Sequence, residues 1–188
     1  MRQLLFAIAM MSAFSMAQAA ENEAPTTNTV VVGEHGTLEI LAPKDWTLIH
    51  TNLHLRGNPE SVELHSAGNT VTIRMTIYWD GFSGQIAKPT EADFDKIVSN
   101  VAVRQYMPIS VEGKFTLEKL HGEAVTGSFA RFTDAGWVPM LKDEYHNLTT
   151  GMFRCGNLWG NFDLLANDKD GPEFQQGLKV MESLRRKP

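Results

Sequence analysis

Hydrophobic and polar residues alternate most regularly between positions 71 and 79. One side of this stretch carries Val71, Ile73, Met75, Ile77 and Trp79, and the positions between them are mostly polar. Successive side chains of a β-strand point to opposite faces of the sheet. The period of two therefore predicts a strand with one buried face and one more polar face.

A turn signal just before this strand predicts a hairpin. Val62 and Leu64 alternate with polar neighbours, and the pair Gly68–Asn69 separates them from residues 71–79; such pairs are favoured in tight β-turns. Other short apolar runs, divided by glycines and prolines, predict further strands. These runs are a second hairpin at 30–32 and 38–41, then 46–49, 114–120, 125–133, 147–155 and 158–165.

Helical spacing replaces alternation in two segments. Thr90 with Asp93 three residues later is a capping pattern, and the apolar spacing after it predicts a helix over 91–105. Asp170, as a capping residue, followed by Pro172 predicts the start of a second helix. We expect residues 185–187, which are all basic, to form the last turn of that helix, where cations complement the helix dipole.

The order of these elements predicts the fold class. The two helices lie far apart in the sequence, with runs of strands between them, and no strand–helix unit repeats. This arrangement is typical of the α+β class. We therefore expect a central, mostly antiparallel sheet flanked by helices.

The first nineteen residues have the three parts of a secretory signal peptide in order. Arg2 precedes an uncharged apolar stretch at 4–16, and Ala-Gln-Ala at 17–19 places small side chains before a cleavage site. Cleavage would export the remainder to a periplasm or to the extracellular space. The expected organisation is a signal peptide at 1–19, a flexible leader at 20–28 and one globular α+β domain at 29–188.

Charge argues against two classes of partner. Removal of the signal takes away one of 17 basic residues and leaves 22 acidic ones, so the net charge becomes 16 minus 22, or about −6. A mildly acidic chain without an internal basic cluster argues against a nucleic-acid-binding protein and against docking on anionic lipid. We also expect no stable membrane insertion after signal cleavage, because the apolar stretch of the signal is shorter than a spanning helix.

Three segments resemble a known superfamily. They are TLEILAPKDW at 37–46, GSFARFTDAG at 127–136 and FDLLANDKDGPEFQQGLKVMESL at 162–184, with the helix around 94–101 between the first two. Together they resemble the PsbP-like and DcrB-like proteins, small exported proteins with an α/β/α sandwich. The resemblance implies a central antiparallel sheet flanked by helices and, by analogy, a non-enzymatic binding or assembly role. It assigns no functional residue to a position of this chain.

Histidines offer one alternative function. His50, His54 and His65, with Glu63 nearby, could supply nitrogen and oxygen ligands to zinc or copper. On one extended strand, His50 and His54 would lie about 13 Å apart. A metal-binding protein of the envelope therefore requires a loop that brings them together, and exposed loop histidines are the simpler interpretation.

A hydrolase has the weakest support. Cys155 is the only cysteine, and it would need a histidine as its base. His146 lies on the same predicted strand at an odd spacing, so the two side chains should face opposite sides of the sheet. A structural or incidental cysteine is the favoured interpretation.

Aromatic residues in loops point to a binding role. Phe82 and Trp137 lie in the two long connections, where exposed aromatic side chains are good anchors for a partner. The sequence has no motif for a cofactor and no catalytic signature. We therefore expect an exported, non-catalytic accessory or binding module that contacts an envelope protein or a small ligand through its loops.

Overall fold

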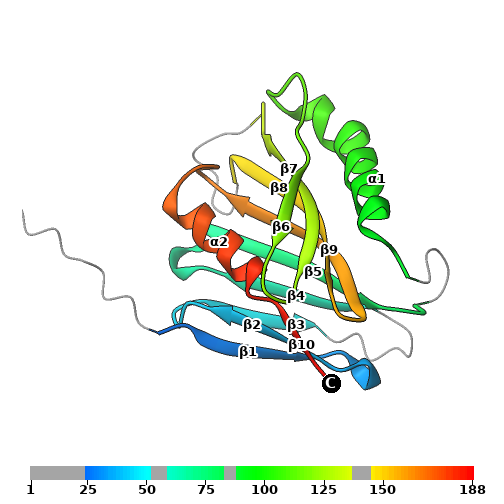
Figure 1. The fold of residues 1–188 in the computed structure, drawn as a ribbon. Coiled ribbons are helices and arrows are strands. Elements are labelled where there is room, and N and C mark those ends of the chain that lie inside the picture. Colours follow the sequence, from blue (N-terminus) through cyan, green and yellow to red (C-terminus); the bar gives the residue numbers. More distant parts are fainter. Residues whose placement is uncertain (1–23, 52–58, 83–87, 137–144) are drawn as a thin grey trace, which may run out of the picture.

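A computed structural model describes residues 24–51, 59–82, 88–136 and 145–188 of the chain. Two sheets and two α-helices form the fold (Figure 1). The larger sheet has seven strands in the order β3-β4-β5-β9-β8-β7-β6, and the smaller has three in the order β1-β2-β10. Every strand pair is antiparallel. The predicted α+β class with a mostly antiparallel sheet is confirmed.

The strands of the larger sheet are β3 (Thr47–Thr51), β4 (Glu60–His65), β5 (Val71–Trp79), β6 (Glu118–His121), β7 (Thr126–Thr133), β8 (Asn147–Cys155) and β9 (Leu158–Ala166). Those of the smaller sheet are β1 (Thr26–Val31), β2 (Thr37–Ala42) and β10 (Arg185–Lys187). The helices are α1 (Glu91–Val101), continued by a π-helical turn (Ala102–Tyr106), and α2 (Pro172–Glu182). Short 3₁₀ turns lie at Gly33–His35, Ala67–Asn69 and Met107–Ile109.

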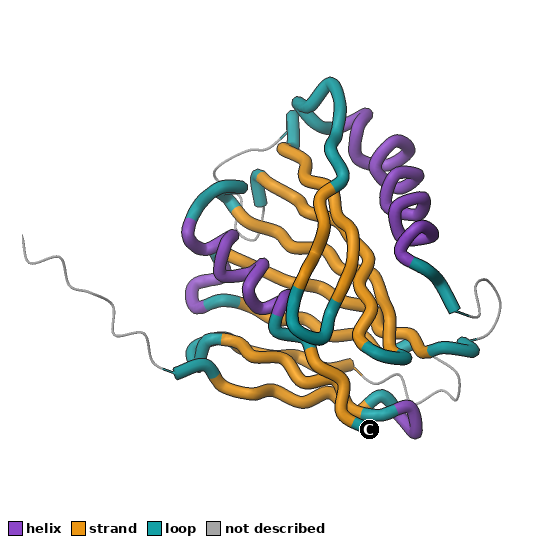
Figure 2. Tube along the Cα trace, in the orientation of Figure 1, coloured by secondary structure: helices purple, strands orange, loops and turns teal. Residues whose placement is uncertain are grey.

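One face of the large sheet carries the main hydrophobic core. The alternation at 71–79 places Val71, Ile73, Met75 and Ile77 on this face, and all four are buried. Helix α2 and the small sheet cover them together, as the tube trace shows from the same side (Figure 2). We call this side of the large sheet the sealed face.

Helix α1 lies on the opposite side, which we call the open face. Phe94, Val98 and Ala102 of the helical segment pack on Ala130 of β7 and Met152 of β8 in a smaller core. The helix therefore covers the β7–β8 half of this face (Figure 1).

Strand β6 begins at Glu118, later than the strand predicted from residue 114. Three further features differ from the sequence-based expectation. Residues 185–187 form strand β10, paired with β2, where the second helix was predicted to end. Gly171, and not the predicted Asp170, is the cap of α2, and it has no side chain to bond the helix; the Asp170 carboxylate contacts Arg131. Strand β1 begins at Thr26, inside the predicted leader. In each case a tertiary partner outweighs a local signal.

Within the described part of the chain, no helix combines the length and the hydrophobicity needed to cross a membrane.

Candidate functional site

A cavity of about 610 Å³ opens on the open face of the large sheet. It lies between the α1 segment and strands β5, β8 and β9. The residues that line it are Tyr78, Phe82, Ile97, Val98, Val101, Gln105, Tyr106, Thr150, Gly151, Met152, Trp159, Asn161 and Asp163.

Helix α1 forms the roof of the cavity, and a capping motif in its own sequence fixes where the helix begins. Thr90 caps the helix: its hydroxyl accepts a hydrogen bond from the Asp93 N–H, and its own N–H donates to the Asp93 carboxylate at 2.9 Å. The Thr90 hydroxyl also donates to this carboxylate, at 2.7 Å, and the two bonds that the carboxylate accepts from Thr90 lower the pKa of Asp93. The predicted cap at the start of this helix is confirmed.

A π-helical turn follows α1 and brings two further residues to the cavity. Residues 102–106 form this wider turn, and Gln105 and Tyr106 within it line the cavity. Such turns are rare and occur frequently at functional sites. The roof of the cavity therefore consists of apolar residues of α1 followed by two polar residues of the π-helical turn, Gln105 and Tyr106.

Aromatic rings form one wall. Tyr78 stacks on Trp159 with ring centroids 4.7 Å apart, and Phe82 meets Tyr78 edge-on at 4.9 Å. Phe82 also meets Trp79, which in turn stacks on His35. The row of rings runs from the small sheet to the cavity and fixes the position of Phe82. The indole N–H of Trp159 is buried and finds no hydrogen-bond partner among the residues that the structure describes.

Asp163 and two hydroxyl groups form the polar part of the cavity. Thr150 lies opposite Asp163 in the β8–β9 pair, and its side chain hydrogen-bonds both Asp163 and Tyr106. Burial raises the pKa of Asp163, although the bond from Thr150 and the charge of Arg74 oppose the rise. Burial, followed by the charge of Asp163, also raises the pKa of Tyr106. The protein thus keeps a carboxyl group in a place that disfavours its charged form.

The structure places Phe82 at this cavity. It reaches the site as a half-buried wall residue beside Tyr78. Trp137, the other predicted binding residue, lies outside the described residues, as does His54 of the predicted metal site.

The other two predicted metal ligands do not meet. His50 pairs across the strands with Val62, and His65 with Thr47, which places the two histidines on opposite faces of the β3–β4 pair. His50 hydrogen-bonds Glu60 at 2.9 Å. His65 contacts Thr72 at 3.0 Å and Glu63 at 3.2 Å. Among the residues that the structure describes, no group of three or more His, Cys, Asp or Glu side chains could hold a metal ion.

Cys155 lies on the sealed face. Its side chain is buried, its thiol donates to the carbonyl of Leu184 at 3.5 Å, and burial raises its pKa. His146 directly precedes β8, and the nine residue steps from His146 to Cys155 span about 30 Å in an extended strand. The two residues do not form a nucleophile–base pair.

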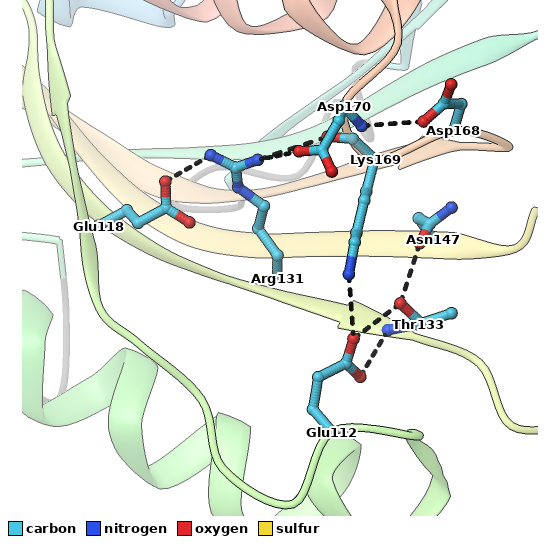
Figure 3. A network of polar contacts seen from close by, with 8 residues as sticks. All are labelled: Glu112, Glu118, Arg131, Thr133, Asn147, Asp168, Lys169 and Asp170. Carbon is cyan, nitrogen blue, oxygen red and sulfur yellow. Dashed lines mark hydrogen bonds and ion pairs between the residues drawn. The ribbon is translucent and has the colours of Figure 1, made fainter.

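A second polar cluster surrounds Arg131 and ties loops together (Figure 3). Arg131 pairs with Glu118 and Asp170, and its guanidinium lies 4.8 Å from the ring of Phe174 in α2. Close by, Glu112 accepts hydrogen bonds from the N–H and hydroxyl of Thr133. Arg131 and Lys169 form ion pairs with Glu118, Asp170 and Glu112 within this cluster, which joins β6, β7 and the start of α2. We assign it a structural role.

Sequence analysis missed most of the cavity. Tyr78 and Asp163 were assigned only to strands, and Tyr106 lies just beyond the helix predicted over 91–105. The available signal was the face of β9 opposite its apolar residues, where Trp159, Asn161 and Asp163 stand at every second position. An aromatic residue and a carboxylate on one face of a strand indicate a binding site only when it is known which element covers that face.

Comparisons with known proteins show the fold. No family model matches the sequence, and no curated protein matches it. Among solved structures, the chain is similar to the solution structure of cyanobacterial PsbP (CyanoP) from Synechocystis sp. PCC 6803, with a TM-score of 0.51 and 10% sequence identity. The alignment covers 93% of this chain and 99% of that one. The predicted PsbP-like resemblance is confirmed at the level of the fold.

Proposed function

We propose that this protein is an exported, non-catalytic binding module whose site is the cavity beneath α1. The ligand is a small organic molecule. The cavity, at about 610 Å³, falls within the range of roughly 300–1,000 Å³ that is usual for small-molecule sites. This observation carries the proposal.

The lining has the composition of a binding site. Apolar and aromatic side chains supply most of the wall, and a few polar groups lie together at Asp163, Thr150 and Tyr106. A ligand would gain affinity from the apolar wall and orientation from the polar groups. The carboxyl group of Asp163, held where its charge is disfavoured, fits a functional role better than a structural one.

Two further features support the accessory role. The fold is similar to that of cyanobacterial PsbP, and the PsbP-like resemblance implies binding or assembly by analogy. Residues 1–19 have the order of a cleavable signal. The amino-terminal sequence of the protein isolated from its own cells tests export: Ala20 as the first residue supports cleavage, and an intact Met1 contradicts it.

The cavity itself is tested by filling it. Val101 lines the roof, so a tryptophan there would occupy the space that a ligand needs. Val103 lies two residues further on and is 57% exposed; Val103→Trp is therefore a matched control with the same change in side chain. The probe is 2-phenylethanol, a small neutral aromatic alcohol.

Chemical shifts of the backbone amides report where the probe binds. We expect shifts at cavity residues in the wild type and in Val103→Trp, and none in Val101→Trp. Equal shifts in Val101→Trp, or shifts only outside the cavity, would contradict the proposed site.

A further inference from the structure

We infer that the cavity selects organic cations, namely amines or ammonium compounds with an aromatic or aliphatic body. This inference rests on the proposed binding function and gives its ligand class. It starts from the charge of the lining: among the described residues that line the cavity, Asp163 is the one with a charged side chain. The described part of the wall contains no Lys, Arg or His.

The carboxylate of Asp163 is influenced by the charge of Arg74 but is not paired with it. Within the described ranges, no Lys, Arg or His forms an ion pair with it. Arg74 is its cross-strand neighbour on β5, but the Arg74 Nε lies 3.5 Å from the carboxylate of Glu63. Arg74 is also exposed, which leaves its effect on Asp163 screened by solvent. A carboxylate in this position gains most from a cation that enters with the ligand.

The aromatic wall favours the same class of ligand. Tyr78, Tyr106 and Trp159 belong to the cavity that contains Asp163, and the faces of such rings attract ammonium groups. Thr150 lies opposite Asp163 in the β8–β9 pair, and its hydroxyl favours the charged form of the carboxyl group. Ile97, Val98 and Val101 of the roof supply contact for an apolar body.

The ligand size follows from the strand. Trp159 and Asp163 are four residues apart on one face of β9, which places their Cα atoms about 13 Å apart. A ligand that places a cation at Asp163 and a ring against Trp159 is therefore elongated. A shorter amine at Asp163 meets the ring of Tyr106 instead, on which the charge of Asp163 acts. An anion of the same size would be repelled by the carboxylate of Asp163, and the described lining residues include no cation to attract the anion.

Three probes of similar size test the charge preference. They are phenethylamine (cationic), 2-phenylethanol (neutral) and 3-phenylpropionate (anionic), each titrated at neutral pH and followed by amide chemical shifts. We expect phenethylamine to bind the wild type at least about tenfold more tightly than 2-phenylethanol. The anion should bind most weakly.

Asp163→Asn removes the charge and keeps an oxygen that accepts the bond from Thr150. It should lower the affinity for phenethylamine about tenfold and lower the affinity for 2-phenylethanol much less. Asp45→Asn, at an exposed residue outside the lining, is the control for the loss of one negative charge and should change neither affinity.

The outcomes separate the two proposals. If 2-phenylethanol binds in the cavity as tightly as phenethylamine, or if Asp163→Asn does not reduce the affinity for phenethylamine, the cation preference is wrong and the binding site stands. If no probe shifts cavity residues at millimolar concentration, the binding site and the preference both fall.

Discussion

The two faces of the seven-stranded sheet are built from the same strands and differ in what covers them. On the sealed face, α2 and the small sheet bury rings such as Phe129, Phe153 and Phe162 almost completely. On the open face, α1 covers β7 and β8, and the cavity extends over β9 towards β5. The comparison indicates that one side of the sheet stabilises the fold while the other has room to bind.

Strand β9 shows the contrast residue by residue. Leu158, Phe162 and Leu164 point to the sealed face and are fully buried. Trp159 and Asp163 point to the open face and line the cavity. Because the side chains alternate, substitutions at neighbouring positions of one strand can separate stability from binding.

The largest effect is expected at Phe162. Its ring is fully buried on the sealed face and lies 6.4 Å from that of Phe129. Phe162→Ala should lower the free energy of unfolding by about 3–5 kcal/mol, because it leaves a cavity in a closed core. Tyr78→Ala removes a half-buried ring on the open face and should cost about 1 kcal/mol. Urea denaturation measures both, and equal losses would remove the distinction between the faces.

A smaller effect is expected from overfilling the sealed face. A Cβ atom at Gly160 would lie 2.1 Å from the backbone oxygen of Thr76 and 2.8 Å from the ring of Phe153. Gly160→Ala should therefore cost about 1–3 kcal/mol, because strands β5 and β9 must separate locally. Gly113→Ala, where nothing lies within 4 Å, is the matched control. If Gly160→Ala and Gly113→Ala have the same free energy of unfolding, strands β5 and β9 separate at this contact without a measurable cost.

The cap of α1 should have a moderate effect on both stability and binding. Thr90→Ala removes the hydroxyl that accepts from Asp93 and should cost about 1 kcal/mol. Because α1 is the roof of the cavity, the affinity for 2-phenylethanol should fall as well. Thr90→Ser keeps the hydroxyl and should restore both quantities. If Thr90→Ala loses stability but binds 2-phenylethanol with unchanged affinity, α1 is not part of the binding site.

The smallest effect concerns Asp163 and has the opposite sign. Burial raises its pKa above the usual 3.8, so the folded protein keeps a proton at pH values where the unfolded chain has lost it. Stability therefore falls as the pH rises from the unfolded to the folded pKa.

Asp163→Asn has no charge to bury and should melt at a higher temperature than the wild type at neutral pH. The difference should shrink as the pH falls through this window. A lower melting temperature at neutral pH would show that the carboxylate stabilises the fold.

The sequence predicted the strands well because their signals are local. The alternation at 71–79 needs one buried face, and the hairpin before it needs only the Gly68–Asn69 turn. Both are confirmed. The start of α1 was also predicted, since Thr90 and Asp93 form the cap within four residues.

The rest depends on partners distant in the sequence. The local sequence at 185–187 favours a helix end, but these residues hydrogen-bond to the edge of β2 and form a strand. Asp170 was expected to cap α2 and contacts Arg131, which lies 39 residues earlier. The cavity needs α1 to lie over β8 and beside β9, and no local pattern states which part of a sheet a helix covers.

The central claim is that the open face binds and the sealed face stabilises. Its most direct test compares Val101→Trp with Phe162→Leu, measuring both the free energy of unfolding and the affinity for 2-phenylethanol. We predict that Val101→Trp loses binding and keeps nearly wild-type stability, while Phe162→Leu loses stability and, well below its melting temperature, binds normally. If Val101→Trp still binds, or if both variants lose both properties together, the division between the two faces is wrong.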